Sequence, residues 1–124
     1  MLSKLKHIKV NIMTEKQIAR LKYLANLTND ILKDTFSNIK IGMTEKEIVK
    51  LTREITDSHM MKIIKEEKEE IIGYDVAWTD CPIVLVGENL AKGGHSLPSD
   101  KKLKKGETIY FDFEQVLNIK KWRK

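Results

Sequence analysis

Two short apolar runs, residues 83–86 and 108–113, constrain the fold of this chain more than any other feature. Both are rich in β-branched and aromatic residues, a composition that predicts β-strands. The stretch between them contains Gly93, Gly94 and Pro98, which predict loop and turn. Because the first run is apolar at every position, we expect it to form an internal strand that is covered on both faces.

Two side chains that could take part in catalysis or metal binding lie within this region. His95 falls in the glycine-flanked loop, and Asp112 falls near the end of the second apolar run. Burying an unpaired carboxylate is very costly, so Asp112 must face solvent, be paired, or bind a metal ion. His95 and Asp112 are therefore the candidate site residues.

A long amphipathic helix is predicted to begin at Thr14. Thr14 and Gln17 have the spacing of a capping box, and the pattern ends before residues 41–42. The intervening apolar residues recur at helical spacing and form one broad face. They are Ile18, Leu21, Leu24, Ala25, Leu27, Ile31, Leu32 and Phe36.

A second helix is predicted to follow, with Thr44 and Glu47 as its capping box and Met43 and Ile48 as a hydrophobic staple. Its apolar face consists of Ile48, Leu51, Ile55, Met60, Ile63 and Ile64. His59 lies on or near this face, where a packing role is favoured over a ligand role.

Gly73 is interpreted as a break in the pattern. Residues 74–79 then form a short strand or an extended connector that carries Trp78 inward.

Composition sets further limits. The 124 residues suffice for one small domain, and no apolar run approaches the roughly 20 residues needed to cross a bilayer. Only one cysteine, Cys81, is present, which fits a reducing compartment, so the cytoplasm is the expected location. The net charge of +5 comes from dispersed lysines without an accompanying aromatic pattern, which disfavours specific nucleic-acid binding.

Several motifs together resemble the pita-bread metallopeptidases, which include methionine aminopeptidase, aminopeptidase P, prolidase and creatinase. The motifs are Gly-Met-Thr-Glu-x-Glu-Ile from Gly42, His-x-x-Pro-Ser-Asp from His95, Leu-Lys-x-Gly from Leu103, and Phe-Asp-Phe around Asp112. The resemblance is to the amino-terminal half of the catalytic domain, is closest to prolidase-type members, and covers roughly residues 14–118.

This resemblance implies a fold and two residue roles. It implies an α+β fold, a partial pita-bread domain with two helices packed on a small antiparallel sheet. In that family the residue matching His95 helps to bind and protonate the peptide. The residue matching Asp112 is the first ligand of a two-metal centre that holds Mn, Co or Zn.

The family pattern ends abruptly after Asn118. Arg123 stands where the resemblance would place the second aspartate ligand, and a guanidinium there would repel metal cations. Glu114 replaces the glycine usual in the family and receives no role. We therefore expect a basic lead over residues 1–13, an incomplete metallopeptidase domain over 14–118, and a divergent basic tail over 119–124. Both a gene remnant and a deliberate short product fit this organisation.

Two functions follow as alternatives. The first is a truncated metal-dependent aminopeptidase or Xaa-Pro peptidase-like domain, inactive alone and without a tightly bound metal ion. Its partners would be a peptide substrate and either a second copy or a complementary half. The second is a non-catalytic peptide- or nucleic-acid-binding module on the same fold. No membrane partner is expected.

Overall fold

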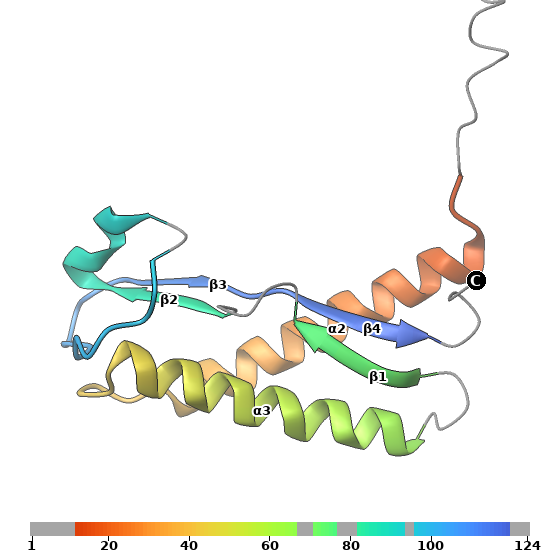
Figure 1. The fold of residues 1–124 in the computed structure, drawn as a ribbon, viewed down its shortest axis with the longest axis horizontal. Coiled ribbons are helices and arrows are strands. Elements are labelled where there is room, and N and C mark those ends of the chain that lie inside the picture. The colour runs from red at the N-terminus through yellow and green to blue at the C-terminus, as the bar shows by residue number, and fades with distance from the viewer. Residues whose placement is uncertain (1–11, 67–70, 77–81, 94–95, 120–124) are drawn as a thin grey trace, which may run out of the picture.

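The structure is a computed structural model that describes residues 12–66, 71–76, 82–93 and 96–119. Both long helices lie on one side of the strands, which gives the predicted α+β fold (Figure 1). The elements in chain order are α2 (Glu15–Asn38), α3 (Glu45–Glu66), β1 (Ile71–Val76), β2 (Ile83–Val86), the 3-10 helix η1 (Gly87–Lys92), β3 (Ile109–Asp112) and β4 (Gln115–Ile119).

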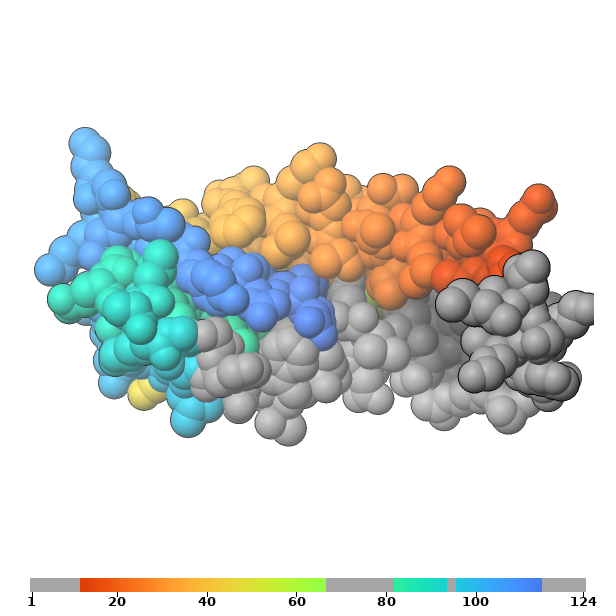
Figure 2. All heavy atoms as spheres, turned by 90° about the horizontal axis from the view of Figure 1, so that it is seen from above, coloured from red at the N-terminus to blue at the C-terminus, as the bar shows by residue number. Residues whose placement is uncertain are grey.

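Helix α2 begins with the predicted capping box. The Thr14 hydroxyl oxygen accepts from the Gln17 N–H at 3.2 Å, and the Gln17 side-chain oxygen accepts from the Thr14 N–H at 2.9 Å. Only part of the apolar face is used for packing, since Ile31 is fully buried whereas Ile18 and Leu21 are 42% and 50% exposed. Figure 2 shows α2 along one margin of the molecule, beside β3.

Helix α3 begins at Glu45, where the Thr44 hydroxyl oxygen accepts from the Glu47 N–H at 3.1 Å. Its buried face contains two threonines that the apolar pattern did not include, Thr52 and Thr56. Each hydroxyl donates to the carbonyl four residues earlier, at 2.8 and 2.7 Å respectively. The hydroxyls are therefore satisfied within the helix, and burial carries no unpaired polar group.

The strands form two antiparallel pairs. Strand β2 pairs with β3 in a register that runs from Ile83 opposite Asp112 to Val86 opposite Ile109. Strand β1 pairs with β4, and β3 and β4 follow one another along one extended line (Figure 1). The sheet predicted from the sequence is thus antiparallel, but it is built as two short ladders.

Two predictions about the strands need correction. The first strand begins at Ile71 rather than Tyr74, and Gly73 lies inside it at a shift in register instead of breaking it. Glycine tolerates the local distortion of such a bulge, so it interrupts the pairing without ending the strand. Trp78 and Cys81 lie outside the described residues, and η1 and β4 were not predicted.

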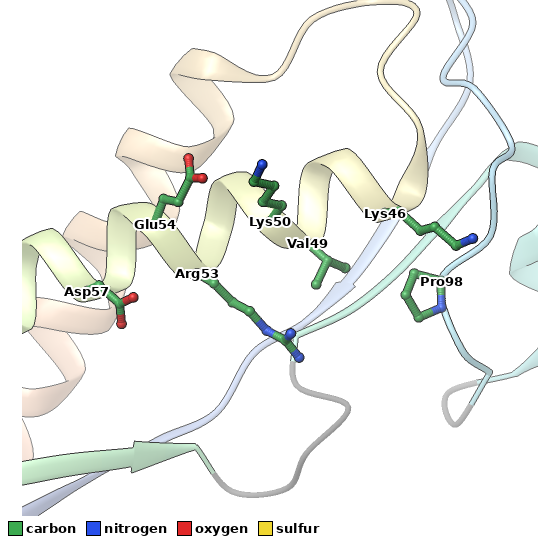
Figure 3. Close-up of a pocket in the computed structure, with 7 residues that line it drawn as sticks. All are labelled: Lys46, Val49, Lys50, Arg53, Glu54, Asp57 and Pro98. Carbon is green, nitrogen blue, oxygen red and sulfur yellow. The ribbon is translucent and has the colours of Figure 1, made fainter.

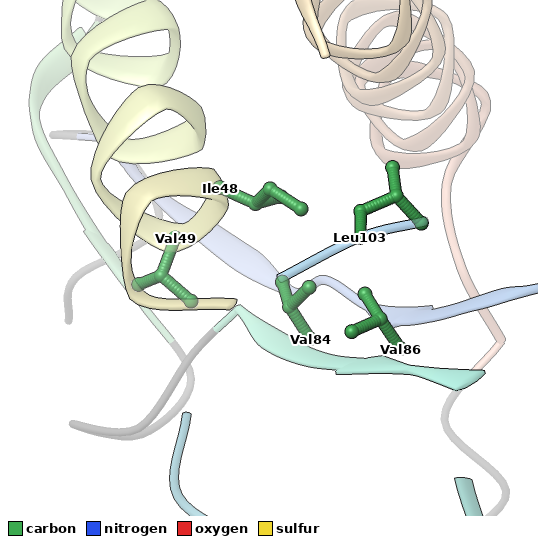
Figure 4. Close-up of a cluster of buried hydrophobic side chains, with 5 residues drawn as sticks. All are labelled: Ile48, Val49, Val84, Val86 and Leu103. Carbon is green, nitrogen blue, oxygen red and sulfur yellow. The ribbon is translucent and has the colours of Figure 1, made fainter. Parts of the chain in front are cut away.

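The core consists of two clusters that share α3. Its later turns pack on α2 through the cluster Leu27, Ile31, Met60 and Ile63. Its first turns pack on β2 through the cluster Ile48, Val49, Val84, Val86 and Leu103 (Figure 4). All four residues of β2 are buried, as expected for a strand covered on both faces, but among the described residues β2 pairs with β3 alone and is not internal to a larger sheet. Among the described helices, none is long and apolar enough to pass through a bilayer.

Candidate functional site

Asp112 ends strand β3 and is half-buried. Its neighbour Phe111 packs toward the helices, with its ring 5.4 Å from that of Phe36 on α2. Because successive side chains of a strand point to opposite faces, Asp112 lies on the ladder face that α2 and α3 do not cover. Ile83, directly opposite, shares that face. The carboxylate is therefore only partly buried, and it lies on the side of the ladder away from the helices.

His95 lies outside the described residues, so its predicted role stays a prediction. The loop around it is tied at its flanks: the Ser96 N–H donates to the Gly93 carbonyl at 3.4 Å, and the Ser96 hydroxyl donates to the Lys92 carbonyl at 3.1 Å. The structure therefore neither joins His95 to Asp112 nor separates them.

The side chains present bear on the metal chemistry that the family resemblance implies. Within the described parts of the chain, no three His, Cys, Asp or Glu side chains are grouped so that they could hold a metal ion. A two-metal centre requires several hard ligands at once. Within the described residues, Asp112 therefore belongs to no group of three such side chains.

Among the described residues, four hydrogen bonds converge on Glu45, which the sequence analysis did not single out. Its side chain is fully buried at the start of α3. One carboxylate oxygen accepts from the Val86 N–H at 2.8 Å and from the Asn89 side-chain amide at 3.1 Å. The other accepts from the N–H of Ser99 at 2.9 Å and from its hydroxyl at 2.7 Å. Each oxygen therefore has two donors.

These donors keep the carboxylate charged. Burial by itself raises the pKa of the Glu45 carboxyl, but the hydrogen bonds from Ser99, Val86 and Asn89 together outweigh it, so the pKa lies below its usual value. Every group that contacts the oxygens is a donor, and an ionised carboxylate is the glutamate form that only accepts. Glu45 is accordingly a buried anion held by neutral donors.

The backbone at the start of α3 is bound to the same loop. The first N–H groups of a helix have no partner within the helix. Here the Glu45 N–H donates to the Lys101 carbonyl at 3.1 Å, and the Lys46 N–H donates to the Ser99 carbonyl at 3.2 Å. The Ser99 hydroxyl oxygen also accepts from the Lys101 N–H at 3.1 Å. We call residues 96–101 the Ser99 segment; it closes the end of the helix.

A hollow of about 310 Å³ lies along the outer side of α3, next to the Ser99 segment (Figure 3). Val49 and Pro98 supply its apolar surface, and Lys46 at one end pairs with Asp100 at 3.3 Å. The remaining lining carries both signs of charge. These residues are Lys50, Arg53, Glu54 and Asp57. The lining therefore does not carry a single sign of charge.

His59 has a structural contact. Its Nε2 lies 3.1 Å from a carboxylate oxygen of Asp34, which joins α3 to α2. The side chain is partly exposed, and the pair sits beside the first core cluster rather than in the hollow. This agrees with the packing role favoured for His59.

Comparison with known proteins gives sequence relatives but no structural ones. The chain is 28% identical over 102 residues to uncharacterized peptidases of Staphylococcus aureus strains MW2 and Mu50. It is 27% identical over 108 residues to an uncharacterized peptidase of Staphylococcus haemolyticus. No protein family profile matches, and no solved structure matches.

These matches cover most of this chain but little of the relatives. The S. aureus matches include 82% of the chain and 25% of the relative, and the S. haemolyticus match includes 87% and 26%. The chain thus spans about a quarter of the length of the curated relatives that it matches. It is similar to one part of bacterial proteins that are named as peptidases.

Proposed function

We propose that this chain supplies one part of the catalytic domain of a metal-dependent aminopeptidase or Xaa-Pro peptidase of the pita-bread type. Asp112 is proposed as one ligand of its metal centre, which would hold Mn, Co or Zn, and His95 as the group that binds and protonates the peptide. The relatives named as peptidases support the general activity. The motifs around His95 and Asp112 support the finer assignment.

The observation that carries the proposal is the position of Asp112. A carboxylate that follows three apolar strand residues would ordinarily be costly in a core. Here it stands half-buried at the strand end, on the face of the β2–β3 ladder that points away from the helices and that it shares with buried Ile83. Phe111 and the second core cluster pack on the opposite face of the ladder, and this packing holds the strand that would present such a ligand.

The same arrangement explains why activity is expected only in a larger assembly. Asp112 supplies one carboxylate, and a two-metal centre needs further ligands to hold and neutralise two divalent ions. When bound, the metal ions would activate water for attack on the peptide. The described residues provide the strand that presents Asp112 and the packed helices behind it. Under this proposal, the remaining ligands come from outside the described residues.

A chimera provides the test. The segment of the S. aureus relative that this chain matches is replaced by the corresponding residues of this chain up to Asn118, so that the relative keeps its own sequence beyond that point. Hydrolysis of Met-Ala-x and x-Pro peptides is then measured with Mn, Co or Zn. The unaltered relative is the positive control. We expect the chimera to cleave at least one peptide class, Asp112→Ala and His95→Ala to abolish turnover, and the exposed Asp30→Ala to leave it unchanged.

Two results would contradict the proposal. One is a chimera that folds with a cooperative melt yet shows no turnover while the parent is active. The other is an active chimera in which Asp112→Ala has no effect. The first would favour the alternative of a non-catalytic binding module. Binding of a fluorescent peptide library to the isolated chain would then become the relevant measurement.

A further inference from the structure

We propose that Glu45 is a positioning residue whose ionised carboxylate locks the Ser99 segment against β2 and η1. This lock determines the shape of the hollow beside α3. The four donors come from three separate parts of the chain: Val86 from β2, Asn89 from η1, and Ser99 from the segment itself. One side chain thus fixes the relative position of three elements.

The hollow depends on this arrangement through Pro98. Pro98 immediately precedes Ser99 and forms the wall of the hollow that faces Lys46 and Val49 (Figure 3). If the Ser99 segment separates from Glu45, Pro98 moves with it and the hollow widens or disappears. The segment also follows His95 directly in the sequence. A role for the segment in peptide binding rests on the proposed function, whereas the lock itself does not.

The chemistry of the lock requires a charged acceptor. A glutamine at position 45 has almost the same shape, but one of its two terminal atoms is a donor. If the NH₂ group replaces one oxygen it opposes the Val86 N–H, and if it replaces the other it opposes the Ser99 N–H. The Ser99 hydroxyl and the Asn89 amide can turn, but a backbone N–H cannot. Either orientation therefore leaves one backbone donor facing another donor.

Protonation of Glu45 should have a related effect, because the added proton turns one carboxylate oxygen into a donor that faces other donors. The groups that contact the carboxylate from β2, η1 and the segment are all neutral. The charged residues of these parts are directed elsewhere: Asp100 pairs with Lys46, Lys101 pairs with Glu107 at 3.5 Å, and Glu88 and Lys92 are exposed. The lock should therefore respond to the charge of Glu45 itself.

The direction of the pH effect follows from the lowered pKa of Glu45. A carboxyl group whose pKa is lower in the folded state stabilises that state fully above the unfolded value, about 4.3. This contribution is lost as the pH falls through the lower, folded value. The lock is therefore complete at neutral pH and opens in acid.

Amide hydrogen exchange on the whole chain tests the proposal. The reporters are the amides of Ser99 and Lys101, and the reference is the amide of Met60 in the middle of α3, each corrected for intrinsic exchange. In Glu45→Gln we expect the reporters to exchange on the order of 10- to 100-fold faster, with a much smaller change at the reference. The matched control is Glu47→Gln, an exposed glutamate in the same turn whose side chain lies outside the lock.

A pH series separates positioning from general stabilisation. In the unaltered chain, reporter protection should fall below about pH 4.3 before the reference loses protection, and Glu45→Gln should lack this step. If Glu45→Gln does not fold, Ser99→Ala removes the hydroxyl donor but keeps the Ser99 N–H, and should accelerate the reporters alone. Equal acceleration of reporters and reference in the variants, or no acceleration, would overturn the proposal. Since no metal or peptide is involved, the outcome is independent of the chimera assay.

Discussion

Replacing Ile31 by alanine should destabilise the chain far more than the same replacement at Ile18 on the same helix. Ile31 is fully buried in the cluster formed by α2 and α3, whereas Ile18 is 42% exposed. The two substitutions remove the same atoms from the same kind of backbone. The comparison therefore isolates the contribution of burial.

The magnitude can be worked from the structure. Alanine removes three carbon atoms from Ile31, worth about 2.4 kcal/mol at ~0.8 kcal/mol per buried CH₂. The cavity left between α2 and α3 adds about 1 kcal/mol, and the better helix propensity of alanine returns about 0.4 kcal/mol. We expect a loss of about 3 kcal/mol in the free energy of unfolding for Ile31→Ala, and less than about 1 kcal/mol for Ile18→Ala.

Urea unfolding followed by circular dichroism at 222 nm provides the assay, at protein concentrations where association is negligible. The slope with denaturant should stay constant, so that the midpoint reports stability alone. For a chain of this length, the expected loss corresponds to a fall of roughly 10 °C in melting temperature. Equal effects of the two substitutions would show that α2 does not pack on α3 through Ile31.

Three further predictions concern the isolated chain. It should not hydrolyse Met-Ala-x or x-Pro peptides with Mn, Co or Zn, and turnover that disappears in Asp112→Ala would contradict this. Calorimetry should show no tight two-ion site, since one carboxylate with solvent ligands binds weakly; two equivalents of Mn at micromolar affinity would reveal missing ligands. Light scattering should show self-association with rising concentration, because α2 leaves Ile18, Leu21 and Phe36 partly exposed. Ile18→Ala should weaken it, and a clean monomer at high concentration would refute it.

Features encoded by neighbouring residues could be read from the sequence. The caps at Thr14 and Thr44 depend on a partner three positions later, and both were found where predicted. The strands of residues 83–86 and 109–112 were recognisable because their composition differs sharply from the surrounding loop. Such signals need no knowledge of the tertiary structure.

The extent of burial was less predictable. The apolar face of α2 is continuous in the sequence, but the fold covers Leu27 and Ile31 and leaves Leu21 half exposed. On α3, Thr52 and Thr56 occupy fully or nearly buried positions that the apolar pattern assigned to neither face. Helical periodicity gives the side of the helix on which a side chain lies, and only the packing partners decide how much of that side chain is buried.

Glu45 shows the limit most clearly. Its position after Thr44 fits an ordinary acidic residue in the first turn of a helix, where the helix dipole favours it. Its partners Val86 and Ser99 lie 41 and 54 positions away, and nothing local distinguishes it from exposed Glu47. Yet of these two glutamates, Glu45 is the one enclosed by four donors. The family motif drew attention to His95 and Asp112, whereas the residue that fixes the described loop becomes visible only when β2, η1 and the Ser99 segment are brought together.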